Sequence, residues 1–362
     1  MLPYILLVLF PIGVSLYEKY GVWKRERRFL LERDVSSMSL LAFFALFLLL
    51  LFIRDESVGC DVVNYHYAFR QALKVNFVTL FDCGFEPLFL LFNCLFAWIL
   101  RFFRLFLIAC AILAVVPVAW FYLKKSPMPL LSVALFLGAA PFSFYFSGLR
   151  QTIAMAMMIP MFELARQKKL KAFLIAGALT CLIHKSAVVG FLLYPLFRFR
   201  ITPKQMWFIG PVMLAVLLGS RPLLRLILSL VGSYGDKYAD IGGTGAYGML
   251  ALFAIFTVYC FVMPDESALR PEDVALRNLM VFILAIQLFV PSHNLFMRLG
   301  YYFHIFLPVI IPRMAIRTKP KLRRLMQCSV IVMQVFFFGY FIWNGYTDAD
   351  VLEIYPYLFP WQ

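Results

Sequence analysis

The stretch Leu105–Leu123, LFLIACAILAVVPVAWFYL, decides the fold of this chain because none of its residues carries a charge. A helix of this length is about 28 Å long, which is close to the thickness of the hydrocarbon core of a bilayer. The basic residues Lys124 and Lys125 follow it directly, as is typical of the polar edge of a membrane helix. The stretch therefore predicts a helix that lies in lipid.

Similar apolar stretches recur along the whole chain of 362 residues, of which 63% are hydrophobic and 15% are charged. A water-soluble fold cannot bury that much apolar surface, and no polar stretch is long enough to form a second, soluble domain. We therefore predict an all-α, polytopic integral membrane helical bundle, with residues 1–362 in a single transmembrane domain. The candidate helices are Leu2–Tyr17, Met38–Ile53, Glu86–Leu100, Leu105–Leu123, Pro129–Ser147, Leu149–Leu164, Ala172–His184, Ser186–Phe197, Met206–Gly219, Tyr247–Met263, Leu279–Val290, Leu299–Ile311 and Leu325–Trp343.

The formal net charge of +15 comes from basic clusters that lie between the apolar stretches. Because this charge is not spread over a soluble surface, nucleic acid is not an expected partner. The positive-inside rule places the clusters Lys19–Arg33, Arg166–Lys171, Arg198–Lys204 and Arg313–Arg324 in cytoplasmic loops. The loops at residues 54–86, 220–248 and 291–298 then face the outside, together with both termini.

This topology contains one conflict of parity. If the loop after Ile53 is outside and Lys124 is inside, the stretches Glu86–Leu100 and Leu105–Leu123 cannot both cross the membrane. One of them must re-enter the membrane or lie along the interface. The predicted total is about twelve transmembrane helices.

The seven cysteines show no spacing typical of a metal site, and no cofactor is expected. Cys60 and Cys83 both fall in the first outer loop, where an oxidising compartment would permit a disulfide. A bridge that closes such a loop would stabilise it by roughly 3 kcal/mol.

The first polar cluster is formed by GCDVVNYHYAFRQAL (residues 59–73) and FDCGFEPLFLLF (residues 81–92), which contain Asp61, Tyr65, Arg70 and Glu86. A carboxylate at the edge of an apolar stretch costs stability unless it is paired or used. Helix capping is an alternative explanation for Glu86, because Pro87 suits the first position of a helix. Asp61 could equally be a solvated residue of a turn.

Two further clusters interrupt apolar stretches on the predicted outer side. SGLRQTIAMAMM (residues 147–158) places Arg150 and Gln151 at the start of a helix, and the arginine offers forked donors that match phosphate oxygens. An arginine that extends along the interface to water is the alternative.

CLIHKSAVVG (residues 181–190) brings His184 and Lys185 to a hairpin tip, where the imidazole could accept a proton or bind phosphate. A polar turn without chemistry is the alternative there.

The segment PSHNLFMRLGYYFHIFLPVIIPRM (residues 291–314) contains the fourth cluster. Arg298, Tyr301 and Tyr302 lie three and four residues apart, which predicts that one helical face presents a cation beside two phenols. An aromatic belt at the interface would have a similar composition.

The stretch SRPLLRLILSL (residues 220–230) has the pattern of a helix that lies in the interface, with Arg221 and Arg225 four residues apart. The loop that follows is rich in glycine and tyrosine. It could stack tyrosine rings on sugars, or it could be a simple connector.

Taken in order, short motifs in this chain resemble the EpsG family of Wzy-type exopolysaccharide and O-antigen polymerases. The resemblance covers nearly the whole chain, although residues 221–248 match no motif. The motifs are G-x-D-x-x-x-Y-x-x-x-F at Gly59–Phe69, E-P-x-F at Glu86–Phe89, L-R-Q with a following I-A at Leu149–Ala154, H-K-S-A at His184–Ala187, R-x-x-Y-Y-F ending in P-R at Arg298–Arg313, and Y-P-Y at Tyr355–Tyr357.

The resemblance implies a GT-C-like glycosyltransferase of the bacterial inner membrane, which joins repeat units carried on polyprenyl pyrophosphate at the periplasmic or extracellular face. Arginines would hold the pyrophosphate, and an acceptor hydroxyl would need a base, for which Glu86, Asp61 and His184 compete. A D-x-D pair occurs in the outer segments only at Asp348 and Asp350, so metal independence is expected. Membrane lipid is an expected partner, and a chain-length regulator is an open one. The candidate substrate contacts are Arg150, Gln151, Arg298, Tyr301, Tyr302, Tyr65, Lys185 and Arg221.

Two other classes of function stay open. One is a different transferase on the same face, either a single-sugar GT-C enzyme or a membrane O-acyltransferase that uses His184. The other is a flippase or transporter of lipid-linked glycans, for which we would expect charges through the midplane and helices related by a repeat. The sequence contains no internal repeat.

Overall fold

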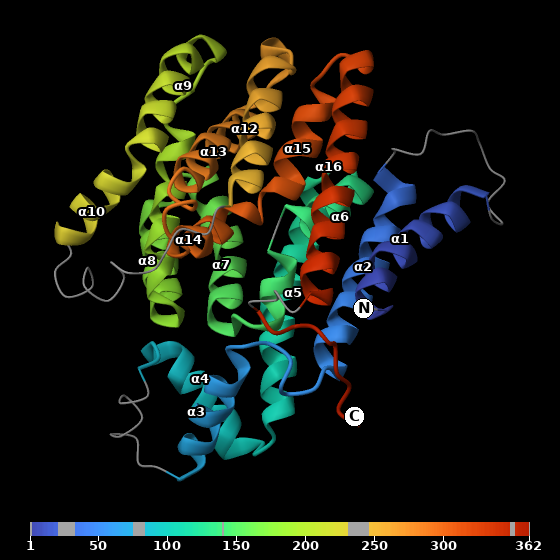
Figure 1. The fold of residues 1–362 in the computed structure, drawn as a ribbon, viewed down its shortest axis with the longest axis vertical. Coiled ribbons are helices and arrows are strands. Elements are labelled where there is room, and N and C mark those ends of the chain that lie inside the picture. Colours follow the sequence, from blue (N-terminus) through green and yellow to red (C-terminus); the bar gives the residue numbers. More distant parts are fainter. Residues whose placement is uncertain are drawn as a thin grey trace.

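The computed structural model describes residues 2–20, 33–74, 84–139, 141–230, 246–347 and 352–361. Within these ranges the protein is helical, and its long helices run roughly alongside one another (Figure 1). The α-helices are α1 (Leu2–Tyr20), α2 (Arg33–Ile53), α3 (Val62–Lys74), α4 (Pro87–Ile99), α5 (Phe103–Lys125), α6 (Pro129–Gly138), α7 (Leu149–Arg166), α8 (Leu170–Ile183), α9 (Pro203–Leu218), α10 (Ser220–Leu230), α12 (Tyr247–Val262), α13 (Pro271–Gln287), α14 (Leu295–His304), α15 (Leu307–Ile316) and α16 (Pro320–Tyr346). The 3₁₀ helices are η2 (Phe142–Phe146), η3 (Lys185–Leu193), η4 (Pro195–Phe197) and η5 (Glu266–Ala268).

Among the described residues, α5 and α16 are each long and apolar enough to cross a membrane. The pair α9 and α10, bent by 75°, and the pair α14 and α15, bent by 50°, would each also qualify if the two helices form one broken span. The other apolar helices are shorter. The structure thus confirms an all-helical fold with at least two candidate membrane spans among the described residues, while the total of twelve crossings stays a prediction.

The parity conflict involves α4 and α5, which differ in length. The 13 residues of α4 extend for about 20 Å, whereas the 23 residues of α5 extend for about 35 Å. Only α5 can therefore cross a hydrocarbon core of about 30 Å on its own. In Figure 1, α3 and α4 lie together at the lower end of α5. These lengths favour α4 as the segment that does not cross.

Three helices that the apolar pattern predicts as continuous are broken or wound differently. The stretch Pro129–Ser147 divides into α6 and the 3₁₀ turn η2, with Pro141 at the break. The stretch Leu299–Ile311 bends between α14 and α15, where Pro308 cannot donate a backbone hydrogen bond. The stretch Ser186–Phe197 forms η3 and η4, and Gly190 there lies so close to Met158 of α7 that a side chain would collide with it. Apolar composition alone cannot reveal these breaks.

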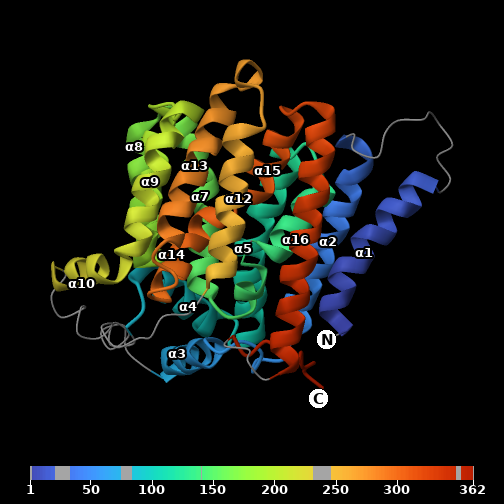
Figure 2. The same ribbon diagram turned by 45° about the horizontal axis from the view of Figure 1, so that its top comes forward.

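Helix α3 is a further difference, because it lies in a stretch predicted as a loop. Its buried residues Val62, Tyr65, Phe69 and Ala72 recur at helical spacing, while the opposite face is exposed. Figure 2 shows that α3 lies across the lower end of the bundle instead of parallel to it. Its apolar face packs partly on α5, since the ring centroids of Phe69 and Phe103 are 5.4 Å apart.

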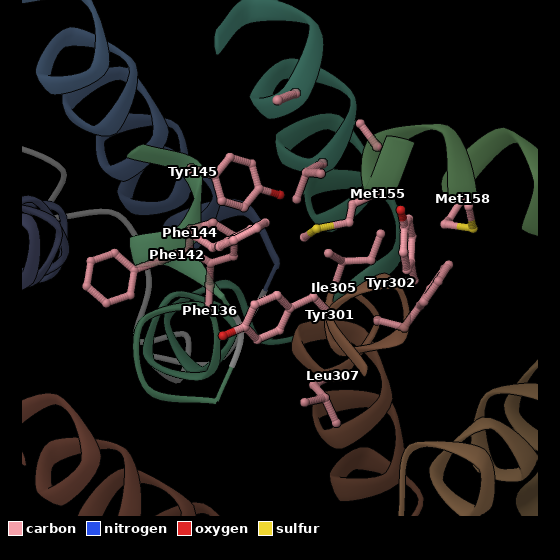
Figure 3. Close-up of a cluster of buried hydrophobic side chains, with 14 of the residues drawn as sticks. Phe136, Phe142, Phe144, Tyr145, Met155, Met158, Tyr301, Tyr302, Ile305 and Leu307 are labelled. Carbon is pink, nitrogen blue, oxygen red and sulfur yellow. The ribbon is translucent and has the colours of Figure 1, made fainter. Parts of the chain in front are cut away.

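A cluster of aromatic rings forms the core around η2 (Figure 3). The rings of Phe136 and Tyr145 lie 5.6 Å apart, and Phe144 lies 5.1 Å from Tyr301 of α14. Such pairs stabilise by about 0.5–1.5 kcal/mol beyond the burial of their area. This packing fixes η2 between α6 and α14, and it thereby fixes Ser147 and the start of α7.

The opposite end of the bundle holds a network of buried charges. Asp273 of α13 is fully buried, and its carboxylate accepts hydrogen bonds from Arg313 at 2.7 Å and from Arg317 at 3.2 Å. Lys125, the last residue of α5, lies 2.8 Å from Glu272. Arg313 and Arg317, predicted in a cytoplasmic loop, are therefore structural partners of α13 acids.

Candidate active site

Three residues from distant motifs meet at the lower end of the bundle. One carboxylate oxygen of Glu86 lies 2.6 Å from the Arg150 guanidinium, and the other lies 3.0 Å from Nδ1 of His184. The backbone N–H of Lys185 also donates to Glu86, at 3.0 Å. Glu86 directly precedes α4, Arg150 is the second residue of α7, and His184 directly follows α8. The carboxylate of Glu86 thus links three helices.

The structure places Glu86 at the N-cap of α4 and Pro87 in its first turn, as predicted, but the Glu86 side chain makes no capping hydrogen bond, so capping alone does not explain this carboxylate. The side chain is only 9% exposed, so the carboxylate depends on Arg150 and His184 for its charge. Arg150 is held on its other sides by aromatic rings, with its guanidinium 4.3 Å from the centroid of Phe85 and 5.8 Å from that of Tyr65. This arrangement fixes the guanidinium at the edge of a cavity.

Burial alone would raise the pKa of Glu86. The hydrogen bonds from His184 and from the Lys185 N–H, together with the charge of Arg150, outweigh burial and lower the pKa to about 2. Both oxygens are therefore occupied, and the carboxylate is a weak base. Glu86 is suited to hold Arg150 and His184 in position.

Glu86→Gln is expected to make the thermal stability of the protein less dependent on pH in the acid range. A depressed pKa contributes stability that is complete above the ordinary value of 4.5 and is lost as the pH falls toward about 2. The glutamine variant lacks this titration. Its melting temperature in detergent should be lower than that of the wild type at neutral pH and should fall less steeply across that acid range. Parallel acid profiles for the two proteins would contradict the ion pair.

Asp61 lies directly before α3 and faces a cavity of about 220 Å³ that is also lined by Arg150 and Tyr65. We call this the Asp61 cavity; its other lining residues are Asn64, Tyr67, Ala68 and Phe85. The side chain of Asp61 is 27% exposed, and its nearest cation is the Arg298 guanidinium at 3.9 Å. A carboxylate with accessible oxygens and a fixed guanidinium therefore face the same space.

The backbone around Asp61 is held from two sides. The Asp61 N–H donates to the Ser147 hydroxyl at 3.1 Å, and the N–H of Cys60 donates to the Leu352 carbonyl at 2.9 Å. Gly59 donates to the Glu353 carbonyl at 2.9 Å and adopts a φ of +107°. The C-terminal segment and the end of η2 thus fix the position of Asp61.

Gly59→Ala is expected to destabilise the protein by about 1–3 kcal/mol and to displace Asp61. A side chain at this position would press against the carbonyl oxygen of Phe146, and the positive φ disfavours any L residue. Gly84→Ala is the matched control, because Gly84 also has a positive φ, +69°, but has open space around it. The stability of the two variants is measured by thermal unfolding in detergent. An equal loss in the two variants would show that the contact with Phe146 is unimportant.

Arg298 and Tyr301 line a second cavity, of about 350 Å³, which we call the Arg298 cavity. Gln151 donates from its amide to the carbonyl of Arg298, so α7 supports the backbone of α14 there. Tyr302 does not share this face, since its hydroxyl lies 2.9 Å from Oγ of Ser186 in η3. The predicted single face of Arg298, Tyr301 and Tyr302 is therefore wrong for Tyr302, and Figure 3 shows the two tyrosines pointing in different directions.

Several other predicted residues have more limited places in this site. Lys185 contributes its backbone N–H to Glu86. Arg221 is exposed near the start of α10, the predicted interfacial helix, which the structure confirms as a helix. Cys60 is a free thiol whose sulfur lies 3.2 Å from the Ser147 hydroxyl, and its predicted partner Cys83 lies outside the described residues. Asp348 and Asp350 lie outside them as well.

Four functional neighbours were missed by sequence reasoning: Asn64, Phe85, Ser147 and Ser186. Each lies within three residues of a residue that was predicted, so proximity in the motif was the available signal. No group of three or more His, Cys, Asp or Glu side chains that could hold a metal ion occurs in the described part of the chain. Arg150 lines the Asp61 cavity, and Arg298 lines the Arg298 cavity.

A family model for the EpsG family matches residues 39–359, which is nearly the whole chain. No curated protein and no solved structure matches the chain. The matched region contains Asp61, Glu86, Arg150, His184 and Arg298.

Proposed function

This chain belongs to the EpsG family of Wzy-type, polymerase-like membrane proteins, and from that membership we propose that it joins oligosaccharide repeat units carried on polyprenyl diphosphate. The proposed reaction takes place at the outer face of a bacterial inner membrane. We also propose a GT-C-like bundle of about twelve crossings. Both ends of the chain lie at the end of the bundle where α3 lies (Figure 2), which supports termini on the side of the site.

One observation carries the proposal: Asp61 and Arg150, from motifs far apart in the sequence, line the same cavity. Transfer of a glycan from a diphosphate carrier needs a cation for the leaving group and a base for the acceptor. The guanidinium offers two parallel donors to phosphate oxygens at any ordinary pH. The Asp61 cavity brings these two functions together.

In the proposed step, an acceptor hydroxyl attacks the anomeric carbon of the donor glycan. A new bond forms between that carbon and the acceptor oxygen while the bond to the diphosphate oxygen breaks. Asp61 takes the proton of the hydroxyl, and Arg150 stabilises the negative charge that develops on the leaving diphosphate. The polyprenyl diphosphate is then released from the lengthened chain.

Among the three candidate bases, the geometry favours Asp61. Glu86 is engaged by Arg150, His184 and Lys185 and is strongly acidic. His184 turns its Nδ1 toward Glu86, which would leave Nε2 as an acceptor when Nδ1 carries the proton. Asp61 lines the cavity that Arg150 also lines. We therefore assign Glu86 to positioning and His184 to a contact with substrate.

An apolar groove beside the charged cluster supports a lipid-linked substrate. The groove, of about 200 Å³, is lined only by aliphatic and aromatic residues of α4, α5, α7 and α8. Leu88 lies two residues after Glu86, Ile153 lies three residues after Arg150, and Ile183 directly precedes His184. A diphosphate at Arg150 would thus have a place for the first isoprene units next to it.

The proposed function is tested with purified protein in vesicles and lipid-linked repeat units extracted from cells that lack this protein. A ladder of glycan lengths on the lipid is the expected product, and a chelator of divalent cations should leave it unchanged. A single added sugar or acyl group would identify another transferase. Transport of the lipid-linked glycan without covalent change would identify a flippase. Either result would overturn the polymerase.

A further inference from the structure

We propose that the Arg298 cavity is the binding site for the acceptor saccharide, and that the Asp61 cavity receives the diphosphate end of the donor. The inference rests on the proposed function, because it assigns the two substrates of that reaction to two separate cavities. The reaction described above uses the Asp61 cavity and the apolar groove, and it assigns no ligand to the Arg298 cavity.

The lining of the Arg298 cavity has the composition that binds a sugar. The partly exposed ring of Phe341 and the borders of the buried rings of Phe144 and Tyr301 form an aromatic wall, against which the C–H face of a pyranose can pack. Arg298 and Asn294 supply donors and an acceptor for hydroxyl groups. The remaining lining residues are Ser143, Met297, Asn344, Gly345 and Leu352.

Size also separates the two cavities. The Arg298 cavity, at about 350 Å³, falls within the range of roughly 300–1,000 Å³ that is typical of small-molecule sites, whereas the Asp61 cavity holds about 220 Å³. The smaller cavity borders the charged cluster at Arg150, and the ring of Phe85 in its lining lies 5.8 Å from the ring of Phe89 in the apolar groove. The larger cavity therefore has room for a saccharide, and the smaller one, which Arg150 lines, suits the diphosphate.

The two cavities meet at a short wall of polar groups. Asp61 lines one cavity and Arg298 lines the other, and their charged groups are 3.9 Å apart. Leu352, which lines the Arg298 cavity, accepts a hydrogen bond from Cys60, the residue before Asp61. A hydroxyl that extends from a saccharide in the Arg298 cavity would thus arrive beside the carboxylate that takes its proton.

The experiment uses the free repeat-unit oligosaccharide, released by mild acid from the lipid-linked pool of cells that lack this protein. This probe has an acceptor hydroxyl but no diphosphate, so it can act only as an acceptor. Its binding to the full-length protein in nanodiscs is measured by calorimetry. The KM of the free oligosaccharide as acceptor is measured in the elongation reaction, with the lipid-linked donor at a saturating concentration.

Asn294→Ala and Asn344→Ala should each weaken binding of the free oligosaccharide and raise its KM by roughly five- to tenfold, while the KM of the donor stays unchanged. The matched control is Asn64→Ala, which removes the same amide from the Asp61 cavity. This control should leave oligosaccharide binding unchanged. The opposite pattern, with binding lost in Asn64→Ala and retained in the other two variants, would overturn the assignment.

The two proposals fail in different ways. If the wild type does not elongate lipid-linked units but binds the free oligosaccharide through Asn294 and Asn344, the polymerase is wrong and the saccharide site stands. If the wild type elongates lipid-linked units and neither asparagine affects oligosaccharide binding or its KM, the polymerase stands and the saccharide site is wrong.

Discussion

Arg150→Ala is expected to reduce the rate of glycan elongation by about 100- to 1,000-fold, as is typical when one preorganised donor to a developing charge is lost. The guanidinium is fixed by Glu86, Phe85 and Tyr65, and among the described residues no other cationic side chain lines the Asp61 cavity. Arg150→Lys keeps the charge but loses the fork, and should recover only part of the rate. Elongation is measured as ladder formation at saturating substrate.

Loss of Arg150 also leaves the Glu86 carboxylate buried without its cation, which could destabilise the protein. The double variant with Arg150→Ala and Glu86→Gln removes that unpaired charge and should be equally inactive. Arg166→Ala is the control on the same helix, since Arg166 lies at the other end of α7 and pairs with Glu163. Full elongation by a correctly inserted Arg150→Ala protein would reject the role of this arginine.

Asp61→Asn is expected to reduce elongation by about 100- to 10,000-fold, because the amide has the same shape but cannot take a proton. Its backbone N–H still donates to Ser147, so the loop should keep its position. The KM of the lipid-linked donor should change little, since Arg150 is untouched. Single-turnover rates of elongation separate the loss of chemistry from any loss of binding.

Asp55→Asn is the matched control for Asp61. Asp55 lies in the same loop, and its carboxylate accepts hydrogen bonds from the N–H and hydroxyl of Ser57. This variant should elongate at nearly the normal rate. If Asp61→Asn elongated at the normal rate and His184→Ala did not elongate, the base would be His184.

Several helices of this protein are predictable because they begin at a local signal. Pro87, Pro203 and Pro320 stand at the first positions of α4, α9 and α16, where a missing N–H costs nothing. The sequence does not reveal where α6 gives way to η2 or where α14 bends into α15. These breaks depend on packing with neighbouring helices.

For the candidate site, too, one part could be predicted from the sequence and another could not. Glu86, Arg150 and His184 each interrupt an apolar stretch, and a charge at such a position needs a partner, so their selection follows from membrane physics. Their pairing with one another depends on how α4, α7 and α8 pack. The ring of Tyr302 shows the limit, because its contact with Ser186 could not be deduced from the spacing to Arg298.

The proposed function requires that the candidate site lies at the outer face of the membrane. This placement is tested most directly by labelling single cysteines in a variant from which the native cysteines have been removed. Arg298→Cys tests the site, since this side chain is 51% exposed, and Lys171→Cys tests the exposed opposite end. A maleimide that cannot cross membranes should label position 298 in intact spheroplasts and position 171 only after permeabilisation. Labelling of position 298 only after permeabilisation would contradict a site at the outer face.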